Sequence, residues 1–409
     1  MTMERADLVV IGGGPAGLAA AVRAKESGVG RVLLLERNPV LGGILNQCIH
    51  DGFGVLRFGS AMSGPEYAAR FIQMAKDAGV EAVTGAMVVE LTPDKKVTYI
   101  TPQGLFEVQT KAVILSTGCR ERTRGALAVP GNRPAGVYTA GVVQYLMNMR
   151  NIAFGKNVVI MGSGDIGLIM ARRMTLEGAR VHCVLEKLPF CSGLPRNVRQ
   201  CIEDFDIPLC LAETVKEIHG DDHITHVITA KVDEKGRFIS GTERTIPCDV
   251  LVLSVGLIPE NELAKACGIE MDPVTGGALA DGDLMTSVPG VFSCGNGLHV
   301  HDLVDLVSEE GERAAEHAAA YLKGEINKQM VPVTVSDGIR YVLPRQLTAG
   351  EDGYLSMRVM LPGRDQQLMV TAGGKTLVSK KMKRVMPSEM IRLKVKNVPV
   401  SEQVEVSLV

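Results

Sequence analysis

Residues 7–17 read Asp-Leu-Val-Val-Ile-Gly-Gly-Gly-Pro-Ala-Gly, and residues 33–36 read Leu-Leu-Leu-Glu. The apolar run 8–11 has the length of a buried parallel strand, and residues 18–25 have the composition of a helix. A second predicted strand, 31–35, ends at Glu36, which lies 19 residues after Gly17. A strand, a G-x-G-x-x-G turn, a helix, a second strand and an acid in this order predict a dinucleotide-binding unit.

Each residue of this unit has its own physical task. Gly12 permits the tight turn, Gly14 lets the backbone approach a pyrophosphate, and Gly17 lets the helix pack closely on the strand. The helix N-terminus faces the negative charge, and Glu36 accepts hydrogen bonds from ribose hydroxyls. The expected cofactor contacts are Gly12, Gly14, Pro15, Ala16, Gly17, Glu36 and the neighbouring Arg37.

The chain repeats this pattern 150 residues later. An apolar strand, 157–161, leads into Gly162-Ser-Gly164-Asp-Ile-Gly167, a helix follows to Leu176, and a strand from Arg180 closes on Glu186. Four matched positions in the same strand–helix context predict a second dinucleotide-binding unit. The expected contacts of this second unit are Gly162, Gly164, Asp165, Ile166, Gly167 and Glu186.

The glycine-rich loop 37–54 follows the first unit and carries polar, chemically reactive groups. We expect Gly42 and Gly43 to contact the cofactor, and Cys48 and His50 are candidate catalytic residues because such loops often hold site chemistry. Two interpretations stay open for each. Cys48 is either a small residue packed near the cofactor or a reactive thiol, and His50 either hydrogen-bonds within the loop or donates a proton.

Further candidate contacts lie in or directly after predicted strands, where small residues let backbone approach a ligand. Met87, in the predicted strand 82–91, either lies beside an adenine or only packs. The others are Thr117 and Gly118 after the strand 112–116, Gly256 after the strand 249–255, and Gly295 with Asn296. Short strands at 97–100 and 106–109 are expected to form a β-meander with residues 82–91.

Composition excludes several classes of protein. The formal charge of −2 in 409 residues favours neither nucleic acid nor a membrane surface as a partner, and no apolar run has the 18 residues of a membrane span. Nine scattered cysteines without C-x-x-C spacing favour a reducing cytoplasm. We predict no metal, because His299 and His301 are two residues apart with no third imidazole nearby.

The C-terminal part differs in pattern. Six short alternating runs after residue 331 predict a small all-β domain that neither nucleotide requires: 340–343, 355–361, 367–371, 376–379, 390–395 and 404–408. Residues 323–329 have the composition of a linker. The stretch 375–396 holds eight Lys or Arg and one Glu, so it is either a solvated face with protected edge strands or a docking surface.

Several of these segments resemble a known family. Ser116-Thr117-Gly118, Gly256-Leu-Ile-Pro259 and Gly-Val-Phe-Ser-Cys-Gly295-Asn296 look like segments of the two-dinucleotide-binding flavoproteins of the pyridine nucleotide-disulfide oxidoreductase superfamily. The resemblance covers residues 5–325. It implies FAD in the first unit and NAD(P)H in the second, where Glu186 favours NAD(H) over NADP(H) because its carboxylate repels a 2′-phosphate. Cys48 stands where disulfide reductases have their flavin-proximal cysteine, but its partner cysteine is missing, and Asn296 replaces the usual Asp.

A closer resemblance rests on Gly118-Cys-Arg-Glu-Arg, on residues 130–141 and on the run 298–305. These look like the flavoprotein that accompanies anaerobic glycerol-3-phosphate dehydrogenase-like proteins. More distantly, they are similar to the NAD/FAD subunits of amino-acid, opine and hydrogen-cyanide-forming dehydrogenases. The resemblance implies a protein redox partner, either a dehydrogenase subunit or an iron–sulfur protein.

Together these observations predict an α/β fold with two Rossmann-like dinucleotide-binding domains and a small C-terminal all-β domain. The FAD domain covers 1–120 and 265–327, the inserted NAD(P)H domain 121–264, and the β domain 331–409. The expected function is FAD-dependent hydride exchange with NAD(H) and electron transfer to or from a partner. Alternatives are a single-cysteine NADH oxidase, peroxidase or persulfide/disulfide reductase that uses Cys48, and a non-catalytic FAD-bearing assembly subunit.

Overall fold

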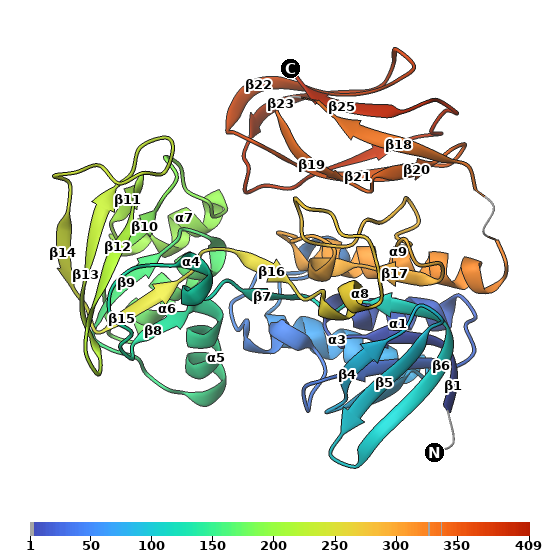
Figure 1. Ribbon diagram of the computed structural model, residues 1–409, viewed down its shortest axis with the longest axis horizontal. Coiled ribbons are helices and arrows are strands. Elements are labelled where there is room, and N and C mark those ends of the chain that lie inside the picture. Colours follow the sequence, from blue (N-terminus) through green and yellow to red (C-terminus); the bar gives the residue numbers. More distant parts are fainter. Residues whose placement is uncertain (1–3, 326–327, 337) are drawn as a thin grey trace. The chain divides into compact units, whose positions relative to one another are not determined.

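The computed structural model describes residues 4–325, 328–336 and 338–409. Part of the predicted linker, residues 326–327, and the start of the predicted FAD domain, residues 1–3, lie outside the described residues. The chain forms two compact units, Met1–Cys119 with Pro259–Val409, and Arg120–Ile258 (Figure 1). The division into three domains at 1–120 with 265–327, 121–264 and 331–409 stays a prediction.

The first unit contains a parallel sheet at its centre. The strands follow the order β3-β2-β1-β6, and β17 pairs with the other side of β6. They are β1 (Glu4–Ile11), β2 (Val32–Glu36), β3 (Glu81–Thr84), β6 (Gly104–Leu115) and β17 (Val291–Ser293). All five residues of β2 are buried, as expected of a strand covered on both faces.

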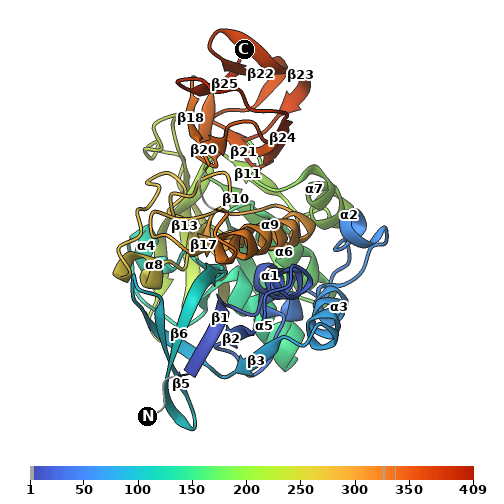
Figure 2. The same cartoon turned by 90° about the vertical axis from the view of Figure 1, so that its right-hand side faces the viewer.

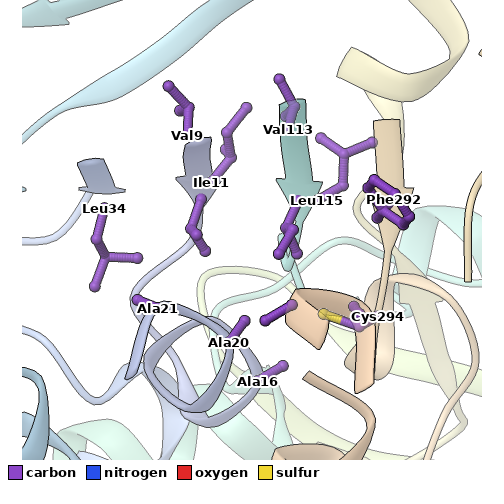
Figure 3. Packing of buried hydrophobic residues seen from close by; sticks show 14 of the residues in the cluster. Val9, Ile11, Ala16, Ala20, Ala21, Leu34, Val113, Leu115, Phe292 and Cys294 are labelled. Carbon is purple, nitrogen blue, oxygen red and sulfur yellow. The ribbon is translucent and has the colours of Figure 1, made fainter. Parts of the chain in front are cut away.

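Two helices of this unit pack closely because their buried faces consist mostly of small residues. The helices of this unit are η1 (Gly43–Gln47), α1 (Pro15–Glu26), α2 (Val55–Phe58), α3 (Gly64–Asp77), α8 (Glu262–Ala266), η3 (Gly295–Gly297) and α9 (Val304–Leu322). Ala16, Ala20 and Ala21 of α1 lie beneath the strands that carry Ile11 and Leu115 (Figure 3). Helix α9 runs beside α1 (Figure 2), and a Cβ on Gly311 would lie only 2.2 Å from Ala16 O.

The predicted meander required two corrections. Residues 82–91 form two strands, because Gly85, with φ +66°, ends β3, which pairs parallel with β2, before β4 (Met87–Leu91) begins. Residues 106–109 and 112–116 were predicted as separate strands but belong to one strand, β6. Its first half pairs antiparallel with β5 (Lys96–Thr101), and its second half pairs parallel with β1. The same strand therefore belongs to both the antiparallel and the parallel part of the sheet.

The second unit repeats the parallel architecture. Its sheet has the order β11-β10-β9-β15-β8, with β8 (Val137–Thr139), β9 (Asn157–Met161), β10 (Arg180–Glu186), β11 (Leu209–Leu211) and β15 (Val250–Leu253). An antiparallel sheet adds β12 (Glu213–Gly220), β13 (Ile224–Lys231) and β14 (Arg244–Pro247). The helices are α4 (Arg124–Leu127), α5 (Ala140–Arg150), α6 (Asp165–Leu176), α7 (Pro195–Cys201) and η2 (Glu203–Phe205). The chain enters through β7 (Cys119–Glu121) and leaves through β16 (Leu257–Pro259).

The C-terminal strands of the first unit form two sheets around their own core (red and orange in Figure 1). One has the order β20-β18-β25-β22-β23 and the other β19-β21-β24. The strands are β18 (Met330–Val335), β19 (Ile339–Leu343), β20 (Gln346–Thr348), β21 (Gly353–Val359), β22 (Gly363–Ala372), β23 (Lys375–Val385), β24 (Ile391–Val395) and β25 (Val404–Leu408). The six predicted runs correspond to six of these strands, and β18 and β20 were missed.

The basic stretch 375–396 divides between two environments. Strand β23 is the edge strand of its sheet, and Lys380 and Lys381 on it are exposed. In contrast, Arg392 pairs with Glu309, and Lys394 with Asp352 at 2.9 Å. Two of the eight basic residues therefore form ion pairs with acidic residues of the same unit. Among the residues that the structure describes, no helix has both the length and the hydropathy of a membrane crossing.

Candidate functional site

Two glycines of the first G-x-G-x-x-G turn are required by the fold itself. Gly12 has φ +110°, and a Cβ there would lie 2.3 Å from Ser116 O. A Cβ on Gly17 would lie 1.8 Å from Gly12 O. Any side chain at either position would push β1, α1 and the end of β6 apart, so these glycines set the shape of the turn.

Gly14 is different, because the fold leaves open space around it. No atom comes within 4 Å of a Cβ built on Gly14, and its φ of −80° and ψ of −170° suit any residue. Helix α1 begins here without a side-chain cap, with Pro15 and Ala16 in its first turn, so backbone N–H groups face this space. We call this space the first cradle, and an anionic pyrophosphate fits it.

The carboxylate of Glu36 accepts hydrogen bonds from the backbone of the glycine turn and from the backbone just after β2. Its Oε2 accepts a hydrogen bond from Gly13 N at 2.7 Å, and its Oε1 accepts one from Asn38 N at 2.7 Å. Gly42 N donates to Gly13 O at 2.8 Å, which brings Gly42 and Gly43 against the turn. The neighbouring Arg37 is mostly exposed and lies 3.9 Å from Glu260.

The second turn copies this arrangement at the same offset of 150 residues. Glu186 Oε2 accepts from Ser163 N at 3.1 Å, and its Oε1 accepts from Leu188 N at 2.9 Å. Gly162 has φ +99°, and a Cβ on it would lie 2.0 Å from Ser254 O. The repeat seen in the sequence is thus a repeat of hydrogen bonds as well as of residue types.

The second turn carries more side-chain contacts than the first. Ser192 Oγ also donates to Glu186 Oε2, at 3.0 Å, and Asp165 Oδ1 accepts from Leu194 N at 2.8 Å. Around Gly164 the space stays open, because only Ser254 atoms come within 4 Å of a built Cβ. Ile166 is half-buried in the first turn of α6. We call this space the second cradle, and it too fits a pyrophosphate.

The other predicted contacts lie in several places. Thr117 and Gly118 lie against η3, because a Cβ on Gly297 would be 3.0 Å from Thr117 Oγ1. Gly295 lies against α1, since its built Cβ would be 2.8 Å from Ala16 Cβ. Gly256 has φ +101° beyond β15 in the second unit, and Met87 is exposed at the start of β4.

Cys48 is at the C-terminal end of η1, and its thiol donates to Ile44 O at 3.4 Å. Burial raises the pKa of this thiol to about 12, so it is protonated at neutral pH. A protonated thiol is a poor nucleophile. His50 is half-buried, with its ring 5.0 Å from the ring of Phe53. This environment favours the packing interpretation of Cys48, and the role of His50 stays a prediction.

A buried charged cluster lies behind η3 and was not predicted. His299 Nε2 lies 3.0 Å and His301 Nε2 3.5 Å from Glu310 Oε1, while Gly295 N donates to Glu310 Oε2 at 2.7 Å. Burial alone would raise the pKa of Glu310, but His301 and His299 together hold that pKa well below its usual range. Burial, assisted by His301, lowers the pKa of His299. Glu310 is therefore an ionised carboxylate inside the protein.

His301 has an acceptor at each ring nitrogen. Its Nδ1 lies 2.9 Å from His299 O, and its Nε2 faces the Glu310 carboxylate. The ligand-type atoms of the three residues lie within 4.8 Å of one another, but the Nε2 atoms that a metal would use face a shared carboxylate oxygen.

Sequence reasoning missed Glu310, although one signal was available. Residues Val307, Gly311, Ala314 and Ala318 form the buried stripe of α9, and Glu310 lies on that same stripe. A carboxylate on an apolar helix face must have polar partners. The histidines at 299 and 301 were noted in the sequence, but no spacing rule connects them to residue 310.

Two cradles, each at the N-terminus of a helix beside a parallel sheet, define a protein that binds two dinucleotides. Residues 6–320 match the family model of the pyridine nucleotide-disulphide oxidoreductases, and the chain belongs to that family. The predicted superfamily is thereby confirmed, as are the predicted α/β fold and its Rossmann-like sheets. The protein is an FAD-dependent NAD(P)H oxidoreductase, as predicted, and its cofactors are FAD and NAD(P)H.

Known proteins resemble most of the chain. An opine oxidase subunit of Agrobacterium tumefaciens (strain Ach5) is 30 % identical over 345 residues, which cover 78 % of this chain and 66 % of that one. Thioredoxin reductase of T. acidophilum has a structure with a TM-score of 0.64 and 27 % identity, covering 79 % of this chain and all of that one. The NAD-dependent persulfide reductase of A. fulgidus shares the fold, with a TM-score of 0.60 and 17 % identity over 95 % of this chain and 71 % of that chain.

Proposed function

We propose that this chain is the NAD(H)- and FAD-binding subunit of a larger redox assembly. It exchanges hydride with NAD(H) at its flavin and passes electrons to or from a partner protein, either a dehydrogenase subunit or an iron–sulfur protein. FAD, when bound, supplies both two-electron and one-electron chemistry. The protein contributes the two cradles, the orientation of the two nucleotides and the exclusion of water.

The observation that carries this proposal is the environment of Cys48. It is the only cysteine between residues 1 and 118, and burial raises its pKa to about 12. A disulfide-type second half-reaction requires a thiolate near the flavin, and this site provides a protonated thiol instead. Electrons that do not leave through a thiol must leave through another acceptor, and a partner protein is the acceptor we propose.

Two resemblances support a dehydrogenase as the partner. The sequence looks like the flavoprotein that accompanies anaerobic glycerol-3-phosphate dehydrogenase-like proteins, and a relative at 30 % identity is by its description one subunit of an opine oxidase. The exposed lysines of β23 offer a basic edge to an acidic partner surface. Pairing across such a surface weakens with salt because exposed charges are screened.

The isolated chain is expected to reduce an artificial dye with NADH, and to do so faster than with NADPH. Glu186 is expected to accept hydrogen bonds from the ribose hydroxyls of NADH, and its carboxylate disfavours a 2′-phosphate there. The same preparation is expected to show no NAD-linked oxidation of glycerol 3-phosphate, hydroxy acids or amino acids. Steady-state assays of the purified chain measure both. Rapid turnover of any of these substrates by the chain alone would disprove the proposal that it works within a larger assembly.

Cys48→Ser is expected to keep NADH-to-dye electron transfer within about threefold of wild type, because a protonated thiol takes no part in hydride exchange. Reduced wild-type protein should show no long-wavelength charge-transfer absorption. Stopped-flow spectra of both proteins test this, with Cys267→Ser as a control on a buried cysteine in α8's C-cap. A charge-transfer band that disappears only in Cys48→Ser, together with peroxide or disulfide reduction, would favour the single-cysteine reductase instead.

A further inference from the structure

The loop 299–302 joins η3 to α9 and is held from its inner side by polar contacts. His299 Nε2 lies 3.0 Å from Glu310 Oε1, and His301 N donates to Asn296 Oδ1 at 3.0 Å. The second bond fixes the amide of Asn296, because its oxygen must face the backbone donor. The Nδ2 group of Asn296 is then the part of the side chain that can donate to a cofactor oxygen.

The same loop is held from its outer side by the C-terminal strands of the same unit. Arg358 on β21 donates from Nη2 to Val300 O at 3.1 Å and pairs with the carboxylate of Asp302. Met390 N donates to the other carboxylate oxygen of Asp302 at 2.6 Å. Nη1 of Arg358 donates to Ser388 O in the segment before β24. One guanidinium therefore connects β21, the segment before β24 and the loop.

The burial of this pair makes it energetically important. The side chains of Arg358 and Asp302 are 12 % and 17 % exposed, and Asp302 helps to keep the pKa of Arg358 raised against the effect of burial. Removing one partner of a buried ion pair leaves the other charge uncompensated, and the backbone that carries it moves to reach water. Here that backbone is the loop that orients Asn296.

We propose that Arg358 is a positioning residue for FAD, and that the C-terminal strands thereby form part of the flavin site. Arg358 fixes Val300 and Asp302, these fix His301, and His301 N fixes the amide of Asn296. The inference requires FAD at the first cradle and does not require a partner protein, so it and the proposed function can fail separately.

The structure provides a matched control for this inference. Arg392 on β24 makes a bidentate pair with Glu309 of α9, and the two side chains are 20 % and 39 % exposed. Like Arg358, it connects the C-terminal strands to the segment after η3. Unlike Arg358, it has no contact with the loop among the interactions that the structure describes. If removing either arginine only loosened the attachment of the C-terminal strands, substitutions of Arg358 and Arg392 would have similar effects. If Arg358 positions the flavin, only its substitution would change the flavin site.

The experiment compares full-length Arg358→Gln, Arg358→Lys and Arg392→Gln, each purified with FAD. Measurements are the FAD dissociation constant, the flavin midpoint potential and the visible circular dichroism of the flavin. Arg358→Gln is expected to weaken FAD binding at least about tenfold and to change both flavin signals, whereas Arg392→Gln stays within about twofold of wild type. Arg358→Lys should restore part of the loss, since lysine keeps the charge but lacks the fork that spans four acceptors, which are Val300 O, Asp302 Oδ1, Pro387 O and Ser388 O.

Equal flavin signals and equal FAD affinity in Arg358→Gln and Arg392→Gln would overturn the inference. If Arg358→Gln does not fold, Asp302→Asn replaces it. That variant keeps the shape of the loop residue and removes the charge, and the same weakening of FAD binding is expected. Wild-type affinity in Asp302→Asn would overturn the inference equally.

Discussion

Gly14→Ala is expected to give a folded protein that has lost FAD, whereas Gly17→Ala is expected to disrupt the fold of the first unit. Both changes add a single methyl group. At Gly14 that methyl meets no atom within 4 Å and fills the first cradle, and at Gly17 it meets Gly12 O at 1.8 Å. We expect Gly14→Ala to weaken FAD binding about a hundredfold, or about 2.7 kcal/mol, because the pyrophosphate can no longer approach the backbone.

Two measurements separate these outcomes. The ratio of flavin to protein absorbance after gel filtration reports FAD retention, and far-ultraviolet circular dichroism with thermal unfolding reports the fold. Gly14→Ala should unfold within a few degrees of the wild-type apoprotein, since a less favourable N-cap residue costs only about 1 kcal/mol. If Gly14→Ala retains FAD at wild-type affinity, the first cradle is not where the pyrophosphate lies.

Glu310→Gln is expected to destabilise the first unit by about 3–5 kcal/mol, because the buried carboxylate is hydrogen-bonded to Gly295 N and His299 Nε2, and a hydrogen bond to a charged group contributes about 1.5–3 kcal/mol. The amide would also turn its NH2 group toward either Nε2 of His299 or the backbone N–H of Gly295, so one of the two contacts loses its acceptor. Loss of FAD should accompany the loss of stability, since Glu310 holds Gly295 beside α1.

The neighbouring residue supplies the control for this change. Glu309→Gln removes a carboxylate that is 39 % exposed and paired with Arg392, so its cost should stay below about 1 kcal/mol. Urea titration followed by far-ultraviolet circular dichroism compares the two variants under the same conditions. Equal midpoints for Glu309→Gln and Glu310→Gln would mean that the buried cluster contributes no more than a surface pair.

The sequence was most informative where local chemistry decides the structure. Gly12, Gly17 and Glu36 act within one strand–turn–helix unit, so spacing alone predicted the turn, and the repeat at Gly162 and Glu186 followed from the same rule. The split of β6 was wrong for a different reason. Its two halves pair with different strands, and a change of partner along one strand leaves no mark in hydrophobic periodicity.

The candidate site was only partly predictable because its remaining contacts are tertiary. Arg358 and Asp302 are 56 residues apart, and the sequence around β21 reads as an ordinary strand. Cys48 was located correctly within a loop, but the raised pKa of its thiol depends on burial, which the loop sequence alone does not reveal. For the same reason we did not expect the C-terminal strands to contact the loop beside η3.

The position of β17 has a consequence for how the protein is made. Its residues Val291–Ser293 pair with Val113–Leu115 of β6, and residues 120–258 of the second unit lie between them in the chain. A ribosome therefore finishes the whole second unit before it supplies the strand that closes the sheet of the first. Until residue 293 emerges, β6 has an open edge, which is the kind of surface that nascent chains must protect from aggregation.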